Sequence, residues 1–379
     1  MPNTNNQTIF ISAGESSGDL LGADLARALY HTNPSLTLIG MGGSRMQEAG
    51  VDVIFDSKQL SVVGALEVIR HLPRILSTLH RIKKYLREIK PNLIILIDFP
   101  DTHFRIMKYA KKLGIPVLYY VSPQIWAWRS GRIKQIKQYV DYMAVLFSFE
   151  EKIYRAANIP VTFVGHPLTQ IAKPSLSKEA SYAFFNLDAR RPIIALFPGS
   201  RHSEMQNHLT VIIESAQEVA KRIPDAQFVL VLADRFDEKD MREKIPHSIK
   251  IIRQHLYDLL QITDAAIAVS GTVTLEIALM RVPLCIIYKM SPLSFWIAKK
   301  LITLKQIGLC NIVLEKMVAK EFIQDNANAQ LISAEIVKLI TDQPYRHQIQ
   351  TDLSEIKNKI SIEPEKSSEK VARIVRELL

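Results

Sequence analysis

The sequence predicts an α/β protein with two doubly wound domains, each built around a parallel sheet. In both halves of the chain, short apolar runs alternate with longer amphipathic stretches. Strands that alternate with helices form parallel βαβ units, and such units make a doubly wound sheet. The length of 379 residues also suits two domains, at roughly 150 residues each.

The individual elements follow from the same alternation. In the first half we expect strands at 9–12, 36–40, 93–98, 117–121, 142–147 and 161–164, with helices at 20–30, 104–113, 132–139 and 150–156. In the second half we expect strands at 193–197, 228–232, 249–253, 265–269 and 284–288, with helices at 208–222, 257–262 and 274–281. Short apolar runs suit buried strands, whereas the longer stretches repeat at helical spacing.

A break in the alternation divides the chain. The stretch 165–191 contains prolines, serines and lysines and is the expected linker. We therefore expect an N-terminal domain over 1–170, a C-terminal domain over 190–345, and a charged helical tail over 346–379 that is broken near Pro364. Two such domains are expected to hold ligands in a cleft between them.

The composition excludes several classes of protein. Hydrophobic residues make up 47% and charged residues 23% of the chain, which is the balance of a globular protein. No apolar run approaches the ~20 residues that span a bilayer, and the polar segment 1–8 does not resemble a secretory signal. Cys285 and Cys310 lie in apolar surroundings, which predicts a reducing, cytoplasmic compartment without disulfides. The formal net charge of +10 favours anionic partners: nucleic acid, phosphorylated substrates or an anionic membrane face.

A glycine-containing turn follows the first expected strand and opens a helix: Gly14-Glu15-Ser16-Ser17-Gly18-Asp19. In an open α/β sheet, loops at the carboxyl ends of strands line the ligand crevice. The glycines permit unusual backbone angles, and Ser17 or Asp19 can cap the helix. The turn matches neither the dinucleotide-binding nor the P-loop pattern, so it predicts either a ligand loop or a capped turn.

Two similar turns occur in the second half of the chain. They are Phe197-Pro198-Gly199-Ser200-Arg201, with Glu204 behind it, and Ser270-Gly271-Thr272-Val273-Thr274-Leu275-Glu276. Each follows a strand and starts a helix, whose free N–H groups and dipole suit a phosphate. Arg201 adds a fork of donors for a diphosphate, and Glu276 can accept hydrogen bonds from ribose hydroxyls. The alternatives are a solvated Arg201 and a Glu276 that only complements the helix dipole.

Two further segments follow strands in the first half. Asp98 ends an apolar run in Asp98-Phe99-Pro100-Asp101, where its carboxylate can act as a general base or cap the next segment. Asp101 is the weaker candidate because it lies further from the strand end. The loop 122–128 contains a proline and two tryptophans, and we expect it either to line an acyl or sugar pocket or to belong to the core.

The stretch 66–90 combines an apolar stripe at helical spacing with seven Lys or Arg against two Glu. The stripe includes Val68, Leu72, Ile75, Leu76 and Leu79. Pro73 is expected to start or kink a helix here. A basic amphipathic helix suits an anionic membrane surface, although a core-facing helix gives the same stripe. A second basic, apolar stretch at 293–305 favours lipid contact.

Several kinds of site have no signature in the sequence. No His/Cys cluster has zinc spacing, no G-x-S-x-G elbow occurs, and no Asp-x-Asp pair offers a catalytic metal site. No recognised nucleic-acid-binding signature occurs either. We therefore expect no bound metal, no cofactor and no nucleic-acid partner.

Taken in order, these segments resemble those of the lipid-A-disaccharide synthase family. The resemblance is carried by 11–19, 40–43, 98–101, 123–128, 163–167, 198–201, 270–276 and the Leu309-Cys310-Asn311 region, and it covers nearly the whole chain. It implies the GT-B fold, in which two Rossmann-like doubly wound domains face each other across a cleft.

The resemblance also implies an activity. The family's enzymes are inverting hexosyltransferases that condense UDP-2,3-diacylglucosamine with 2,3-diacylglucosamine 1-phosphate and release UDP, without a metal. The product is the β-1,6-linked lipid A disaccharide 1-phosphate of Gram-negative lipopolysaccharide synthesis. The implied location is cytoplasmic, peripherally associated with the anionic inner face of the inner membrane. The oligomeric state is left open, with a homodimer among the alternatives.

Residue roles follow from the same resemblance. Asp98 would take the proton from the acceptor 6-hydroxyl, Arg201 would stabilise the departing UDP, and Glu276 would hold the ribose. The expected substrate-binding residues are Glu15, Ser17, Gly199, Ser200, Ser270, Gly271, Thr272, Glu276, Asn311 and Gln324.

Two other kinds of protein remain as alternatives. One is another UDP-sugar enzyme of the same fold, such as a UDP-N-acetylglucosamine 2-epimerase or a peptidoglycan-type N-acetylglucosaminyltransferase. The basic, apolar stretch 66–90 argues against the soluble substrate of an epimerase. The other is a non-enzymatic lipid-binding or membrane-scaffold protein, against which the phosphate-type turns at 198–201 and 270–276 argue.

Overall fold

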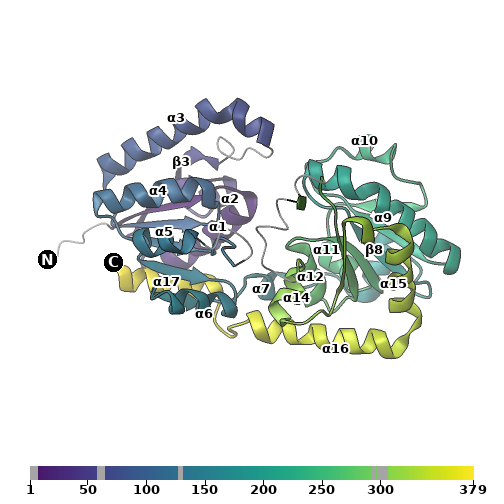
Figure 1. Cartoon of the computed structure of the whole chain (residues 1–379). Coiled ribbons are helices and arrows are strands. Elements are labelled where there is room, and N and C mark those ends of the chain that lie inside the picture. The colour runs from purple at the N-terminus through teal and green to yellow at the C-terminus, as the bar shows by residue number, and fades with distance from the viewer. Residues whose placement is uncertain (1–6, 58–64, 127–130, 292–294, 297–305) are drawn as a thin grey trace. The chain divides into compact units, whose positions relative to one another are not determined.

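The computed structural model of the chain describes residues 7–57, 65–126, 131–291, 295–296 and 306–379, with the backbone alone at 65–72 and 74. The chain forms two compact units, which Figure 1 draws in one colour ramp. Unit 1 comprises Met1–Pro167 and Ser361–Leu379, and unit 2 comprises Leu168–Ile360.

Unit 1 contains a parallel seven-stranded sheet in the order β3-β2-β1-β4-β5-β6-β7. Its strands are β1 Thr8–Ala13, β2 Thr37–Gly42, β3 Asp52–Asp56, β4 Leu93–Ile97, β5 Val117–Tyr120, β6 Tyr142–Val145 and β7 Val161–Phe163. Its helices are α1 Ser16–Thr32, α2 Ser44–Glu48, α3 Ala65–Ile89, α4 Pro100–Leu113, α5 Arg132–Tyr139, α6 Ser148–Ala156 and α17 Ser367–Leu378. The central strand β4 is apolar and buried throughout, as a strand covered by helices on both faces must be.

Unit 2 contains a parallel six-stranded sheet in the order β10-β9-β8-β11-β12-β13. Its strands are β8 Ile193–Phe197, β9 Gln227–Val231, β10 Ile249–Ile252, β11 Ala265–Val269, β12 Leu284–Tyr288 and β13 Lys320–Ile323. Its helices are α7 Leu168–Ile171, α8 Lys178–Phe185, α9 His202–Arg222, α10 Glu238–Arg242, α11 Leu256–Leu260, α12 Val273–Leu279, α14 Leu309–Leu314, α15 Ala329–Thr341 and α16 Gln343–Ile360.

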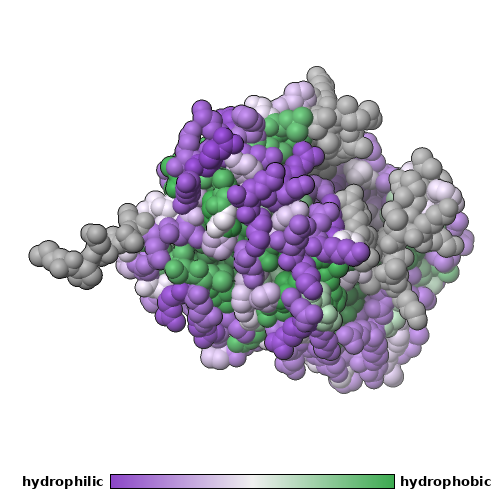
Figure 2. Space-filling view, turned by 60° about the vertical axis from the view of Figure 1, so that its left-hand side comes forward, coloured by the Kyte–Doolittle hydropathy of each residue, from purple (hydrophilic) through white to green (hydrophobic). Residues whose placement is uncertain are grey.

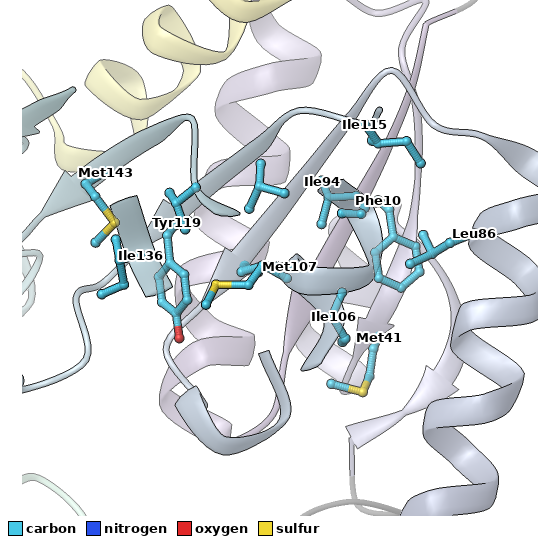
Figure 3. Packing of buried hydrophobic residues seen from close by; sticks show 14 of the residues in the cluster. Phe10, Met41, Leu86, Ile94, Ile106, Met107, Ile115, Tyr119, Ile136 and Met143 are labelled. Carbon is cyan, nitrogen blue, oxygen red and sulfur yellow. The ribbon is translucent and has the colours of Figure 1, made fainter. Parts of the chain in front are cut away.

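A single apolar layer joins the sheet of unit 1 to the helices on one of its faces. Side chains of β1, β4 and β5 meet those of α3, α4 and α5 there, and Figure 3 shows part of this packing. Helix α1 packs against α17 instead, and right-handed crossovers place α1 on the opposite face of the sheet. The sheet is therefore buried on both sides, which explains its long apolar runs.

The predicted alternation is confirmed, and the two strands that the sequence did not predict lie at sheet edges. They are β3 and β13, which pair with one neighbour each. An edge strand has less of its surface buried than a central strand. Both can therefore carry charged residues, such as Asp52 and Lys320, in place of an apolar run.

The expected linker and tail are folded parts of the two units. Helices α7 and α8 lie within 165–191, and Asp258 accepts hydrogen bonds from the backbone N–H groups of Ser175 and Leu176, at 2.6 and 2.7 Å. After α16 the chain leaves unit 2, and α17 packs on α1 of unit 1. The break near Pro364 thus marks the return of the chain to the first unit.

Candidate active site

Sheet topology brings the sequence motifs of each unit together. In unit 1 the strand order reverses between β1 and β4, so the turn that begins at Gly14 lies beside the turn that begins at Asp98. In unit 2 the order reverses between β8 and β11, beside the turns 198–201 and 270–276. Ligands of open α/β sheets bind at such switch points, outside the carboxyl ends of the strands.

The turn after β4 places strain on two residues that carry side chains. Asp98 and Phe99 both have φ +51°, in the left-handed region. That conformation costs roughly 1–2 kcal/mol for a residue such as Phe and less for Asp, whose short polar side chain tolerates it. A buried hydrogen bond contributes about 1 kcal/mol, so several are needed to hold this turn. Such strain concentrates at functional sites, which supports Asp98 as the candidate base.

The main-chain oxygen of Asp98 accepts two of these hydrogen bonds. His103 Nδ1 lies 2.5 Å and Tyr119 Oη 2.9 Å from it. His103 Nε2 lies 2.9 Å from Ser12 Oγ on β1. Burial lowers the pKa of His103 to about 3, so the ring is neutral near pH 7. The sequence analysis did not single out His103, although it stands in the buried stripe of α4 with Ile106, a position where a polar ring needs partners.

The glycine turn after β1 packs directly on the Asp98 turn. A side chain at Gly14 would meet the Phe99 ring at 2.1 Å, so only glycine fits there. Asp19 does not cap its own helix. Its carboxylate accepts hydrogen bonds from Gly43 N and Met46 N and thereby caps α2. The two expected substrate contacts of this turn, Glu15 and Ser17, are exposed at the strand end.

A buried carboxyl group anchors the loop after β5. Trp126 Nε1 donates to Glu150 Oε1 at 3.0 Å, and Phe147 N donates to Glu150 Oε2 at 3.3 Å. Glu150 is 2% exposed, and burial raises its pKa to about 7 against these hydrogen bonds. Ser122 Oγ lies 2.7 Å from Tyr154 Oη. The loop residues 122–126 are thus held from inside the fold, while Trp128 lies outside the described residues.

Helix α3 divides the expected membrane-contact residues. Leu79 is 3% exposed and belongs to the core, so it does not form part of an outer contact face. Ile75 is partly buried against the same core, and Leu76 is 48% exposed. The side chains of Val68 and Leu72 lie outside the described part of the structure. Pro73 lies inside the helix, which begins at Ala65.

Glu204 occupies the turn after β8 in unit 2. Its Oε2 accepts hydrogen bonds from Ser200 N at 2.9 Å and Arg201 N at 3.2 Å. The two main-chain donors expected to hold a phosphate are therefore already used. Gly199 has φ +102°, and the Arg201 side chain is 57% exposed, with its Nη1 3.7 Å from Glu204 Oε1. The guanidinium, and not the N–H groups of Ser200 and Arg201, is the anion-binding group that this turn offers.

The turn after β11 is held by its own side chains. Ser270 Oγ donates to Ile307 O at 2.7 Å, while Gly271 and Thr272 are exposed. Glu276 Oε1 accepts from Tyr257 Oη at 2.8 Å, and burial raises the pKa of Glu276. One oxygen of the expected ribose contact is therefore occupied by Tyr257, which the sequence analysis did not single out.

The side chains of Asn311 and Gln324, two of the expected nucleotide contacts, form hydrogen bonds within unit 2. Asn311 is fully buried. Its Oδ1 accepts from Val318 N and Ala319 N, and its Nδ2 donates to Ala319 O and Glu321 Oε1. Gln324 exchanges two hydrogen bonds with the main chain of Met290. The Asn311 amide is saturated, so it can shape a pocket only through the backbone that it holds. The half-buried Gln324 amide uses only one of its two amide hydrogens and one of its two acceptor positions in these bonds.

A second buried histidine links α9 to β12. His208 Nδ1 donates to Glu204 O at 2.6 Å, and its Nε2 accepts from Lys289 N at 2.7 Å. Burial lowers the pKa of His208. Among the described residues, no group of three or more His, Cys, Asp or Glu could hold a metal ion. Within the same part of the chain, no helix is long and apolar enough to cross a membrane.

Comparison with known families gives a match over nearly the whole chain. A family model described as Lipid-A-disaccharide synthetase matches residues 9–375. The chain is 46% identical over 374 residues to the lipid-A-disaccharide synthase of Coxiella burnetii (strain Dugway 5J108-111), a match that covers 99% of each chain. It is 44% identical over 382 residues to that of Geobacter sulfurreducens, covering 100% of this chain and 99% of the other.

Solved structures share the fold at low sequence identity. The S. aureus MnaA–UDP co-structure aligns with a TM-score of 0.68 and 13% identity and covers 98% of each chain. The UDP-GlcNAc 2-epimerase from Neisseria meningitidis, bound to UDP-GlcNAc, aligns with a TM-score of 0.62 and 14% identity, over 98% of this chain and 99% of the other. The predicted GT-B class, two Rossmann-like domains with parallel sheets, is confirmed.

Proposed function

The chain belongs to the lipid-A-disaccharide synthetase family, and from this premise we propose the reaction that it catalyses. It transfers 2,3-diacylglucosamine from UDP to the 6-hydroxyl of 2,3-diacylglucosamine 1-phosphate, with inversion, and releases UDP. The identity of 46% over 99% of a named lipid-A-disaccharide synthase supports this assignment. The single observation that carries the mechanism is the left-handed turn of Asp98 at the carboxyl end of β4, which two buried hydrogen bonds to its main-chain oxygen hold in place.

Asp98 acts as the general base in this proposal. It takes the proton of the acceptor hydroxyl while that oxygen attacks the anomeric carbon and the bond to UDP breaks. A positioned base of this kind contributes about 10²–10⁴-fold to the rate. Asp101 is the less suitable carboxylate, because its side chain is 79% exposed and lies 2.5 Å from Arg132 Nη2.

Unit 2 holds the nucleotide in this proposal. Arg201 stabilises the charge that develops on the leaving diphosphate, and the remaining oxygen of Glu276 accepts hydrogen bonds from ribose hydroxyls. Gly199, Ser200, Ser270, Gly271 and Thr272 form the main-chain walls of this pocket. No metal takes part in these steps.

The substrates carry acyl chains, so we also propose contact with an anionic inner-membrane surface. Leu76 is an exposed apolar residue of α3, and a surface hollow of about 770 Å³ has Lys83, Arg105, Lys108 and Lys112 in its lining. Figure 2 shows a face of the molecule on which hydrophilic side chains predominate, with smaller apolar patches between them. Basic side chains suit anionic lipid headgroups, and an exposed apolar side chain suits the boundary of the acyl chains.

Incubation with both acylated sugars, followed by mass spectrometry, tests the reaction directly. We expect the disaccharide 1-phosphate and an equal amount of UDP. Release of UDP without the acylated acceptor would favour a sugar-nucleotide enzyme such as an epimerase, which shares this fold. If UDP binds but no product forms, the chain is not the synthase.

Two matched pairs of variants test the assigned residues. Asp98→Asn should lower turnover by at least about 100-fold, whereas Asp101→Asn should stay within about threefold of the parent. Arg201→Ala should lower kcat/KM by about tenfold or more, whereas Arg222→Ala, at the other end of α9, should not. An Arg201→Ala enzyme within about threefold of the parent, under roughly 0.7 kcal/mol, would remove the diphosphate role.

Membrane contact is tested by flotation with anionic vesicles. Leu76→Glu should reduce the vesicle-bound fraction, while Leu331→Glu, a comparably exposed site in unit 2, should not. Leu79→Glu should lower the free energy of unfolding, because Leu79 is a core residue, and should not act on vesicle binding directly. Equal flotation of Leu76→Glu and the parent would exclude α3 as the contact.

A further inference from the structure

A buried chain of hydrogen bonds ends at the main-chain oxygen of Asp98. It runs from Ser12 Oγ to His103 Nε2, and from His103 Nδ1 to Asp98 O, with Tyr119 Oη as a second partner of the same oxygen. Ser12, His103 and Tyr119 are each 0% exposed. The three residues come from β1, α4 and β5, so these hydrogen bonds connect elements on both sides of β4.

Hydrogen-bond chemistry fixes the direction of each bond. A carbonyl oxygen only accepts, so His103 Nδ1–H and Tyr119 Oη–H must both donate to Asp98 O. A neutral ring that carries its proton on Nδ1 has an acceptor at Nε2, to which Ser12 Oγ–H donates. Burial holds the pKa of His103 at about 3, so this arrangement persists across the working pH range of an enzyme.

The geometry of this oxygen controls where the Asp98 carboxylate points. The peptide between Asp98 and Phe99 joins two left-handed residues, and its orientation sets the torsion angles on both sides. Donors that hold the oxygen from two elements prevent this peptide from rotating to a more ordinary conformation. Figure 3 shows the Tyr119 ring within the apolar layer beside Met107 and Ile136, where it has little freedom to move.

We propose that His103 and Tyr119 are positioning residues of the reaction, which hold the Asp98 turn so that its carboxylate meets the acceptor hydroxyl. They act through the main chain of Asp98 and do not touch substrate. The proposal rests on the proposed role of Asp98 as the base. Its consequence is that loss of either donor lowers kcat and leaves the KM of both substrates nearly unchanged.

Two conservative replacements of His103 separate the two ring nitrogens. An Asn amide nitrogen can occupy the place of Nδ1, whereas a Gln amide nitrogen reaches the place of Nε2. His103→Gln should therefore lower kcat by about tenfold or more, because a small misplacement of a catalytic group is costly. His103→Asn should recover at least about a third of the parent kcat, since it keeps a donor to Asp98 O. A general loss of packing would affect both variants alike.

Tyr119→Phe deletes a single hydroxyl and keeps the ring in the core. It should lower kcat about three- to fivefold, with each KM within about twofold of the parent. Tyr142→Phe is the matched control on the neighbouring strand β6, because it also deletes a phenol hydroxyl that bonds within the sheet, to Thr162 Oγ1 at 2.8 Å. Its kcat should equal that of the parent.

Single-turnover assays of folded protein, run beside Asp98→Asn, separate the outcomes. The inference is overturned if His103→Gln and Tyr119→Phe turn over at the parent rate while Asp98→Asn is inactive. It is also overturned if His103→Asn is as impaired as His103→Gln. An active Asp98→Asn enzyme would instead remove the proposed base and leave the hydrogen-bonded chain a structural feature. If the His103 variants do not fold, Tyr119→Phe against Tyr142→Phe decides alone.

Discussion

In each unit, one of the two strands beside the reversal of the strand order ends in a turn with left-handed residues, but those residues differ. In unit 1 the turn after β4 puts Asp98 and Phe99 in the left-handed region, whereas in unit 2 the turn after β8 uses Gly199 there. A side chain in that region costs up to roughly 1–2 kcal/mol, less for Asp than for Phe, and glycine avoids this cost. Unit 1 therefore retains a side chain where the backbone would favour glycine, which is expected if the carboxylate of Asp98 is needed at that point.

The groups that hold the two turns differ in the same way. Neutral, fully buried His103 and Tyr119 donate to the turn of unit 1. A carboxylate, that of Glu204, accepts from the turn of unit 2, and its side chain is 16% exposed. The neutral, buried donors of unit 1 hold one geometry over a wide range of pH and salt. The turn of unit 2 leaves the Arg201 guanidinium exposed to solvent, where it is accessible to an anion.

The largest expected effect concerns the buried carboxyl group of unit 1. The pKa of Glu150 is raised by burial from an ordinary 4.5 to about 7. The protonated Glu150 therefore contributes its full share to the free energy of unfolding below about pH 4.5. This contribution, on the order of 3 kcal/mol, is lost as the pH rises through about 7. Glu150→Gln removes this titration, so its free energy of unfolding should change less between about pH 5 and pH 8.

Urea denaturation of both proteins at several pH values measures this difference. The Gln side chain keeps an oxygen that accepts from Trp126 Nε1, but its NH₂ group faces the donor Phe147 N and cannot accept from it. The variant should therefore be less stable than the protonated parent by about 1–2 kcal/mol, and this loss should not depend on pH. The stability advantage of the parent at low pH should therefore shrink as the pH rises, and the variant should become the more stable of the two by about pH 8. A difference that stays constant from about pH 5 to pH 8 would show that Glu150 does not titrate in this range.

The next effect tests the glycine of unit 2. A side chain at Gly199 would meet Glu204 Cβ at 2.6 Å, and φ +102° is unfavourable for alanine. Gly199→Ala should lower the free energy of unfolding by about 2 kcal/mol and weaken UDP binding measured by calorimetry. Gly271→Ala is the control for stability, because open space surrounds that position and it should be neutral or slightly stabilising. Equal stability of the two variants would contradict the comparison of the turns.

Much of the fold follows from apolar runs, and two of the exceptions have related causes. The strands 193–197, 265–269 and 284–288 begin and end where the sequence predicts, because buried parallel strands are apolar throughout. The edge strand β3 contains Asp52 and Asp56 and escaped prediction. Helices α7 and α8 escaped prediction for a related reason, since their stability depends on contacts such as that of Ser175 with Asp258 rather than on a local pattern.

The candidate site divides along similar lines. Turns that follow strands could be found from sequence, because residues at strand ends share one edge of a sheet. The partners that hold those turns could not be found, since Ser12 and His103 are 91 residues apart and meet only through β1 and β4. For the same reason the sequence could not show that Asn311 is saturated by its own chain or that Glu204 fills the donors of the phosphate-type turn.

The smallest expected effect separates stability from catalysis at Asp98 itself. Asp98→Gly and Asp98→Asn both lose the carboxylate, so both should be inactive, but glycine is free of the left-handed strain at φ +51°, which Asn tolerates only in part. Glycine also increases the entropy of the unfolded chain, which offsets part of the gain, so Asp98→Gly should be more stable than Asp98→Asn by about 0.5–1 kcal/mol. Urea denaturation of the two inactive variants measures this difference without interference from activity. If Asp98→Gly were the less stable of the two, the left-handed turn would be relaxed in solution and the contrast with Gly199 would disappear. If it is the more stable, the side chain of Asp98 is retained at a measurable cost in stability, and catalysis is the property that requires it.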